Sequence, residues 1–232
     1  MLQSSCALRD KGWTCSLTVS VVELYNEEPR DLLAASGTAA QEREKMQFSK
    51  DALPLKISFS NGSVSVGGLS YEPLLGACVS DGMRQLRELL SRSNRARTTA
   101  STQMNSVSSR SHVLFMLNVD LRNPADGTVL QGGLRLVDLA GSERLARTGT
   151  LNDAARLKES VNINKSLSCL ADVFCALGRK GKNNHVPYRN SKRTLLLQDC
   201  LSGDGKALMM VNYSPTEASQ QETMCSLRFP NQ

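Results

Sequence analysis

The sequence predicts an α/β domain. Two observations lead to this prediction: short apolar runs of strand length recur along the chain, and longer stretches between them repeat leucine with helical spacing. Hydrophobic residues make up 40% of the 232 residues, and charged residues make up 22%. The chain can therefore bury a core, and it has room for one large or two small domains.

The first part of the chain is predicted to form a helix, a long strand and a hairpin. Residues 1–12 should form a short helix and a turn. Thr14–Tyr25 should be a strand whose apolar residues form two faces: Leu17, Val19 and Val21 on one, Val22 and Leu24 on the other. Residues 55–59 and 63–66 should pair, because Asn61-Gly62 between them is a strong hairpin-turn signal.

A helix and two strands are expected next. Ser80 or Asp81 can cap a helix that ends near Arg92 and buries Met83, Leu86, Leu89 and Leu90. Residues 113–121 should be a strand with one apolar face, formed by Val113, Phe115, Leu117, Val119 and Leu121. After a turn at 123–127, the run 134–139 is rich enough in leucine and valine to be a buried strand.

The last third should contain two helices and a strand. A long helix is predicted over 154–177, with a buried stripe formed by Ile163, Leu167, Leu170, Phe174 and Leu177. Residues 207–213 are predicted to be a strand, and residues 217–229 to begin a final helix.

The charge of the chain favours an anionic partner. The net charge is +6 and the pI is about 9.0, which suits nucleic acid, an anionic membrane or an acidic protein surface. No apolar run approaches the length that spans a bilayer. Aromatic residues are only 4% and no nucleic-acid motif occurs, so nucleic acid and membrane rank low. The seven cysteines include no C-x-x-C pair, which is typical of reduced cytosolic thiols.

Asp138 and Gly141 form a candidate phosphate-sensing element at the end of the predicted strand 134–139. A carboxylate in this position attracts Mg²⁺ or its waters, as in P-loop nucleotidases. A glycine lacks Cβ and lets a backbone N–H approach a γ-phosphate closely. The alternative is a strand followed by an ordinary turn.

A serine-rich stretch, Asn105 to His112, precedes the strand 113–121. Ser108 and Ser109 could donate to phosphate oxygens or hold a Mg²⁺ water, and Arg110 could form a bidentate bond with Glu143. Such a pair suits a latch that closes when nucleotide is bound. The alternative is a serine-rich surface loop.

Together these stretches, Asn105-Ser-Val-Ser-Ser-Arg-Ser-His112 and Asp138-Leu-Ala-Gly-Ser-Glu143, resemble the two switch motifs of the kinesin motor domain. Further similarity lies in Tyr25-Asn-Glu, in Asn162 to Ser168 and in His185 to Lys192, and it extends over nearly the whole chain. Residues 206–215 are most similar to the C-terminal-motor, minus-end-directed branch. The resemblance implies a partial kinesin motor domain over residues 1–232, with a mixed central sheet of the P-loop-nucleotidase kind.

The resemblance also implies ligands and residue roles. ATP and Mg²⁺ would be handled by Asn105, Ser108, Ser109, Asp138 and Gly141, with Ser109 and Asp138 reaching Mg²⁺ through water. Arg110, Glu143 and Asn164 would serve catalysis. The partner would be the microtubule, in the cytoplasm, contacted through Lys158, Lys165, Arg189 and Lys192; a dimer would form through segments outside the chain.

The sequence departs from the family pattern in two ways. Arg193 stands where leucine is usual, and Leu195 stands where a polar or basic residue is common. No G-x-x-x-x-G-K-[ST] phosphate-binding loop occurs. The resemblance thus implies that the N-terminal third of a motor is missing, including a central strand next to the Tyr25-Asn-Glu strand, where unpaired backbone groups are expected. Two functions stay open: part of an ATP-driven motor, or a module that grips microtubules or a partner without hydrolysing ATP.

Overall fold

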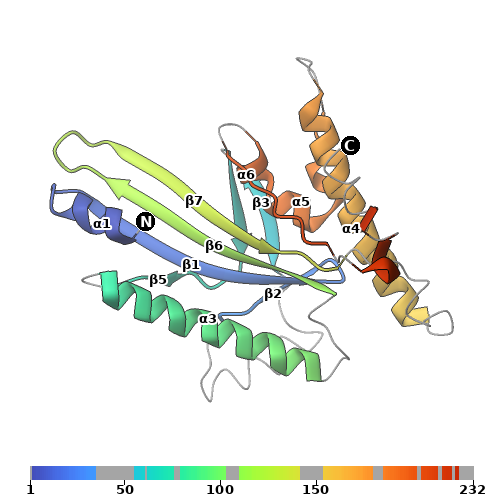
Figure 1. The fold of residues 1–232 in the computed structure, drawn as a ribbon. Coiled ribbons are helices and arrows are strands. Elements are labelled where there is room, and N and C mark those ends of the chain that lie inside the picture. Colours follow the sequence, from blue (N-terminus) through green and yellow to red (C-terminus); the bar gives the residue numbers. More distant parts are fainter. Residues whose placement is uncertain are drawn as a thin grey trace.

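A computed structural model describes residues 2–34, 55–60, 62–75, 79–102, 110–141, 154–179, 185–202, 205–213, 216–220 and 223–224. It confirms the α/β class, with helices packed around an antiparallel sheet (Figure 1). The first helix is α1 (Leu2–Arg9), as expected. None of the helices in these ranges is long and apolar enough to cross a membrane.

The main sheet is built around β1 (Thr14–Tyr25), whose bounds are those predicted. Its strand order is β2-β1-β6-β7, and β5 also pairs with β1. The partners of β1 are β2 (Glu28–Asp31), β5 (Glu72–Pro73) and β6 (Ser111–Arg122). β7 (Val129–Asp138) pairs with β6 along its whole length, and every one of these ladders is antiparallel.

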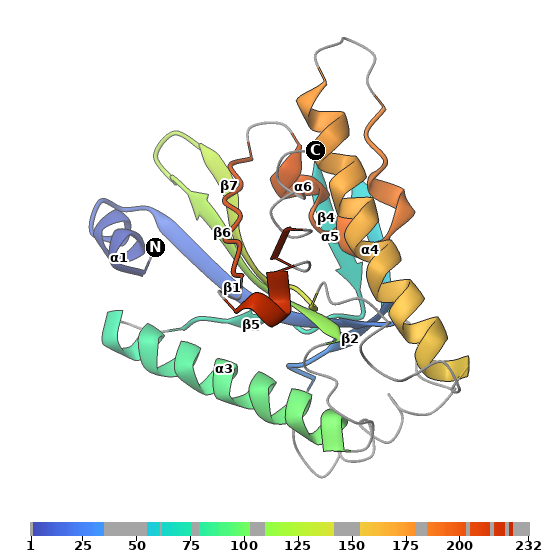
Figure 2. The same ribbon diagram turned by 45° about the vertical axis from the view of Figure 1, so that its right-hand side comes forward.

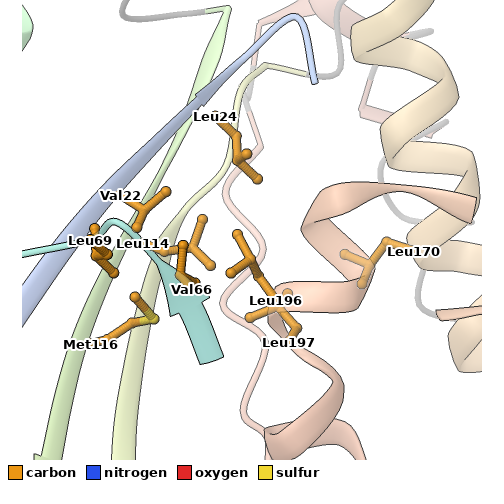
Figure 3. Packing of buried hydrophobic residues seen from close by; sticks show 9 residues of the cluster. All are labelled: Val22, Leu24, Val66, Leu69, Leu114, Met116, Leu170, Leu196 and Leu197. Carbon is orange, nitrogen blue, oxygen red and sulfur yellow. The ribbon is translucent and has the colours of Figure 1, made fainter. Parts of the chain in front are cut away.

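The alternation of β1 divides the core into two clusters, as predicted. Leu17, Val19 and Val21 pack on one side of the sheet with Leu89 and Leu117. Val22 and Leu24 pack on the other side with Leu114, Met116, Leu170, Leu196 and Leu197 (Figure 3). The central strand is thus covered on both faces, which accounts for apolar residues at both its odd and its even positions.

Each cluster is covered by different elements. The helix α3 (Val79–Thr102) lies along one face of the sheet (Figure 2). The hairpin of β3 (Lys56–Ser60) and β4 (Ser63–Gly67), together with α5 (Lys192–Leu196) and α4 (Ala154–Gly178), packs against the other. The hairpin confirms its prediction, and Gly62 adopts the positive φ of 77° that its tight turn requires.

The prediction for α3 was wrong in length and partly wrong in its buried face. The helix begins at Val79 and continues ten residues past Arg92, to Thr102, because no glycine or proline interrupts the polar stretch that follows. Leu86 and Leu89 pack on the core, whereas Met83 and Leu90 are exposed. Ser93 and Ala96 continue the packed face instead.

One strand prediction was wrong in its burial, and another was wrong altogether. The run 134–139 does lie in a strand, β7, up to Asp138, but β7 is the last strand of the described sheet, and Leu134 and Leu136 are 38% and 55% exposed rather than buried. Residues 207–213 form no strand: Leu208 and Met210 are 89% and 80% exposed. Neither segment has a further strand among the described residues to pair with, and apolar strand segments need such a neighbour to be buried.

Among the described residues, the open slot expected beside the Tyr25-Asn-Glu strand is not found, because β1 has partner strands on both edges. On one edge of β1, β2 pairs with residues 22–25 and β5 with Thr18 and Val19, and β6 covers the other edge. β7 lies at one edge of the sheet and has no described strand on its far side. A strand supplied from elsewhere would therefore extend the sheet beyond β7.

α4 has nearly the predicted bounds, but its buried stripe is shifted. Leu170 is buried, Leu167 and Phe174 are half-buried, and Leu177 is exposed, while Ile163 has no described side chain. Ser166, Cys169, Val173 and Ala176 supply the rest of the buried face. Of the final helix predicted over 217–229, the described residues contain the short turn η4 (Glu217–Ser219) and residues 223–224.

Candidate functional site

Asp138 ends β7 with its side chain 67% exposed, and it is already paired. Arg97 of α3 donates from Nη1 to Asp138 Oδ2 at 3.1 Å, and its Nη2 lies 3.4 Å from Ser111 Oγ at the start of β6. Arg97 is only 19% exposed, because α3 continues far enough to bring it to the end of the sheet.

Glu23 lies beside this pair and was not predicted to have a role. Its side chain is fully buried in β1, and Arg97 Nε lies 3.8 Å from Glu23 Oε1. Neither carboxylate oxygen has a hydrogen-bond partner among the described residues. The sequence did carry a signal: Glu23 occupies the next position in the register of Leu17, Val19 and Val21, so a charged residue interrupts a buried apolar face.

The structure describes some of the other predicted nucleotide residues. Gly141 follows the buried Ala140 and is half-buried, and Arg110 is half-buried immediately before β6. Asn105, Ser108, Ser109 and Glu143 lie outside the described residues, so the predicted Arg110–Glu143 latch stays a prediction. Asn164 and Lys158 lie in α4, where their side chains are not described.

His112 connects the Gly141 segment to α4. Its Nδ1 accepts a hydrogen bond from the Ala140 backbone N–H at 2.9 Å, and its Nε2 lies 3.0 Å from Ser166 Oγ. Since Nδ1 is an acceptor, the neutral ring must carry its hydrogen on Nε2 and donate it to Ser166. Burial, and then the charge of Arg193, lowers the pKa of His112 from 6.5 to about 3, so the ring is neutral at pH 7.

The tip of the β1–β2 hairpin holds α4 and α5. Asn26 and Glu27 both have positive φ, at 54° and 64°, as a tight two-residue hairpin turn requires. Asn26 Oδ1 accepts from the side chain of Asn162 in α4. Glu27 accepts from Ser191 Oγ at 2.8 Å and from the Lys192 backbone N–H at 2.7 Å. The Tyr25-Asn-Glu motif therefore anchors two helices rather than forming only a turn.

Arg193 is fully buried at the start of α5, which confirms that a charge stands at an apolar position. Its Nη2 donates to the Ser166 carbonyl oxygen, while Nε and Nη1 have no hydrogen-bond partner in the part of the chain that the structure describes. Burial lowers the pKa of Arg193 to about 10, and the negative charge of Glu27 opposes that shift. The guanidinium is therefore charged at pH 7 inside the core.

Three of the predicted microtubule-binding cations lie on neighbouring elements. Lys165 is on α4, Arg189 is on η3 (Tyr188–Asn190) and Lys192 begins α5, and all three are exposed. Residues of α4, η3 and α5 pack directly against one another. Figures 1 and 2 show α4 and α5 side by side, away from α3. The structure thus gathers basic residues on one group of elements.

This combination defines a domain of the P-loop nucleotidase class: an acidic strand end and a glycine beside a sheet, linked through buried polar side chains to outlying helices. The kinesin motor domain model matches residues 2–232. The chain belongs to the kinesin motor-domain family.

Individual relatives agree with this assignment. Kinesin-like protein KIN-14D of Arabidopsis thaliana is 44% identical over 230 residues, which are 99% of this chain and 28% of that protein. Among solved structures, the motor domain of the Saccharomyces cerevisiae kinesin-like protein KAR3 has a TM-score of 0.73 and 38% identity, covering 97% of this chain and 61% of that one. The C-terminal motor domain of Kar3 from Candida glabrata has a TM-score of 0.70 and 35% identity, covering 96% and 58%. These relatives confirm the predicted similarity to the C-terminal-motor branch, and the chain spans less than two thirds of each.

Proposed function

We propose that this chain forms the switch and microtubule-binding part of a kinesin motor, and that it grips microtubules through α4, η3 and α5. The observation that carries the proposal is the set of exposed cations Lys165, Arg189 and Lys192 on three elements that pack together. Lys158 would extend the same surface along α4. The net charge of +6 suits the acidic surface of a polymer such as the microtubule.

ATP and Mg²⁺ would meet the chain at the end of β7. The residues present fit this role in part: Asp138 offers an exposed carboxylate, and Gly141 offers a backbone N–H without a side chain. Asn105, Ser108 and Ser109 would add polar contacts. Arg110 and Glu143 would form the latch around the attacking water, and Asn164 would link α4 to the nucleotide end. Bound Mg²⁺ would neutralise developing phosphate charge.

A second function, grip without hydrolysis, is favoured by a specific observation. The 232 residues contain no G-x-x-x-x-G-K-[ST] loop to cradle the β- and γ-phosphates. We therefore infer that coupling to ATP requires a phosphate-binding loop supplied from outside these residues. We place the chain on cytoplasmic microtubules, with any dimer formed through other segments.

Co-sedimentation with microtubules tests the proposal. The purified chain should bind, and binding should weaken as salt rises, because the contact is between opposite surface charges. Single Lys165→Ala, Arg189→Ala and Lys192→Ala substitutions should each weaken binding by about threefold, as expected for exposed charges. Arg87→Ala, at an exposed position on α3, is the matched control and should leave binding unchanged.

The same experiment with ATP separates the two functions. If ATP does not change binding and no ATP is hydrolysed, the chain binds microtubules without acting as a motor, which supports the second function. Release by ATP, with turnover, means that the chain itself holds nucleotide by another route. Binding that is indifferent to salt and to all three substitutions would contradict the proposed surface.

A further inference from the structure

Ser166 of α4 is contacted from two sides by buried polar groups of other elements. His112 Nε2 reaches its hydroxyl at 3.0 Å, and the guanidinium of Arg193 donates to its carbonyl oxygen. Ser166, His112 and Arg193 are 3%, 5% and 0% exposed. Water cannot easily replace these contacts, so a displacement of α4 at this residue would leave buried polar groups unpaired.

The other end of the His112 ring holds the segment after β7. Its Nδ1 accepts the Ala140 N–H at 2.9 Å, and Ala140 immediately precedes Gly141. Ala140 and Ser166 therefore bond to opposite nitrogens of one rigid ring. A shift of either residue must rotate the ring or break one of its two bonds, because an imidazole has no internal torsion.

Resting on the proposed function, we propose that His112 is a positioning residue that couples the Gly141 segment to the microtubule-binding helix through Ser166. Ser166 directly follows Lys165, one of the cations assigned to the microtubule contact. Arg193 holds the same turn of α4 to α5, which carries Lys192. The relay Ala140–His112–Ser166 thus joins the phosphate-sensing end of the sheet to the polymer-binding surface by two hydrogen bonds.

Amide exchange at Ala140 in the free chain tests the relay without any ligand. Ser166→Ala removes only the hydroxyl and does not touch Ala140. It should nevertheless speed exchange of the Ala140 N–H by about fivefold, the low end of typical coupling between sites. Ser168→Ala, an exposed serine on the same helix, is the matched control and should have no effect.

Two variants of His112 divide the relay into halves. His112→Asn places an amide oxygen near the position of Nδ1 and cannot reach Ser166, whereas His112→Gln can reach Ser166 but not Ala140. In the His112→Asn background, adding Ser166→Ala should change Ala140 exchange no further. An unchanged Ala140 rate in Ser166→Ala, or an equal effect in both backgrounds, would overturn the relay. If the His112 variants fail to fold, the Ala140 exchange rates of Ser166→Ala and Ser168→Ala still show whether the relay exists.

Microtubule binding supplies a second readout. In the unsubstituted chain, binding should alter Ala140 exchange, and in Ser166→Ala that response should vanish while the affinity stays within about twofold, since the surface cations remain. A full response in Ser166→Ala would refute the relay. Failure of the unsubstituted chain to bind microtubules would refute the proposed function instead. The relay would still be tested by Ala140 exchange in Ser166→Ala and Ser168→Ala without microtubules.

Discussion

Arg97 Nη1 lies 3.1 Å from Asp138 Oδ2, so the carboxylate predicted to attract Mg²⁺ is already bonded to a cation from α3. The same guanidinium faces the buried carboxylate of Glu23 through Nε at 3.8 Å. The two acidic partners differ in environment, since Asp138 is 67% exposed and Glu23 is fully buried. Arg97 therefore stabilises the buried charge of Glu23, whereas its contact with the exposed Asp138 contributes less to stability.

We expect Arg97→Ala and Asp138→Asn to affect stability very differently. Removing Arg97 leaves the Glu23 charge buried without its cation, which should lower the free energy of unfolding by about 3 kcal/mol. Asp138→Asn removes a carboxylate that is itself 67% exposed and should cost less than about 1 kcal/mol. Urea unfolding followed by circular dichroism gives both values.

The double variant Arg97→Ala/Glu23→Gln is the control for this assignment. Because glutamine carries no charge, it should recover much of the loss caused by Arg97→Ala. A double variant as unstable as Arg97→Ala alone would show that Arg97 acts through packing rather than through Glu23.

Glu27 should contribute to stability through α5. Glu27→Ala removes the acceptor of the Ser191 hydroxyl and of the Lys192 N–H, and we expect a loss of about 1–2 kcal/mol. Glu28→Ala, at the exposed neighbouring position, should cost little. Thermal unfolding of the two variants side by side makes the comparison, and equal losses would contradict the anchoring role.

His112 should make the chain less stable in mild acid. The pKa of His112 is about 3 in the folded chain against an ordinary 6.5, so below pH 6.5 the unfolded chain binds a proton that the folded chain does not. Stability from this group is complete above pH 6.5 and falls as the pH drops toward 3. Between pH 6.5 and pH 5 the loss should be about 2 kcal/mol.

Urea unfolding at pH 7 and pH 5 measures this dependence. His112→Gln should flatten the difference between the two pH values, whatever its effect on stability at pH 7. His185→Gln, at an exposed position, should keep the full dependence of the unsubstituted chain. An unchanged slope in His112→Gln would assign the acid sensitivity to other groups.

The strand β1 was predictable because its signal is local. Val19 and Val22 point to opposite faces in a period of two, and both faces are buried, so the pattern alone gives the bounds and the division of the core. α3 was predicted too short because the contacts of its last turns are not local. These turns carry few apolar residues, and Arg97 contacts partners on β1, β6 and β7 that no local pattern contains.

The candidate site was predictable only as a set of motifs. Asp138, Gly141 and the cations of α4 and α5 follow from the resemblance, but the bonds that connect them do not. His112 and Ser166 are 54 positions apart, and Glu27 and Lys192 are 165 apart. Such contacts depend on how the hairpin tip, α4 and α5 pack together, which is a property of the folded chain.

Arg193→Leu should stabilise the chain. Within the described ranges, the buried guanidinium makes one hydrogen bond, to the Ser166 carbonyl oxygen, and Nε and Nη1 have no partner there. Replacing such a charge by an apolar residue of similar size commonly gains about 1–2 kcal/mol. Arg193→Ala should gain less, because it leaves a cavity at this fully buried position. Thermal melts of both variants test this, and a melting temperature lowered by leucine would mean that the Ser166 contact outweighs the burial of charge.

The open edge of β7 should make the chain self-associate. Leu130, Leu134 and Leu136 lie at alternate positions of the strand and are 52%, 38% and 55% exposed, and no described strand pairs beyond them. An apolar edge of this kind is a template for pairing with another chain.

Sedimentation velocity over a range of concentrations should show association in the unsubstituted chain. Leu136→Lys should shift it toward the monomer, because a charge on an edge strand opposes pairing. Gln3→Lys adds the same charge at an exposed position of α1 and should leave association unchanged. Equal suppression by the two lysines would mean that net charge, rather than the β7 edge, governs association.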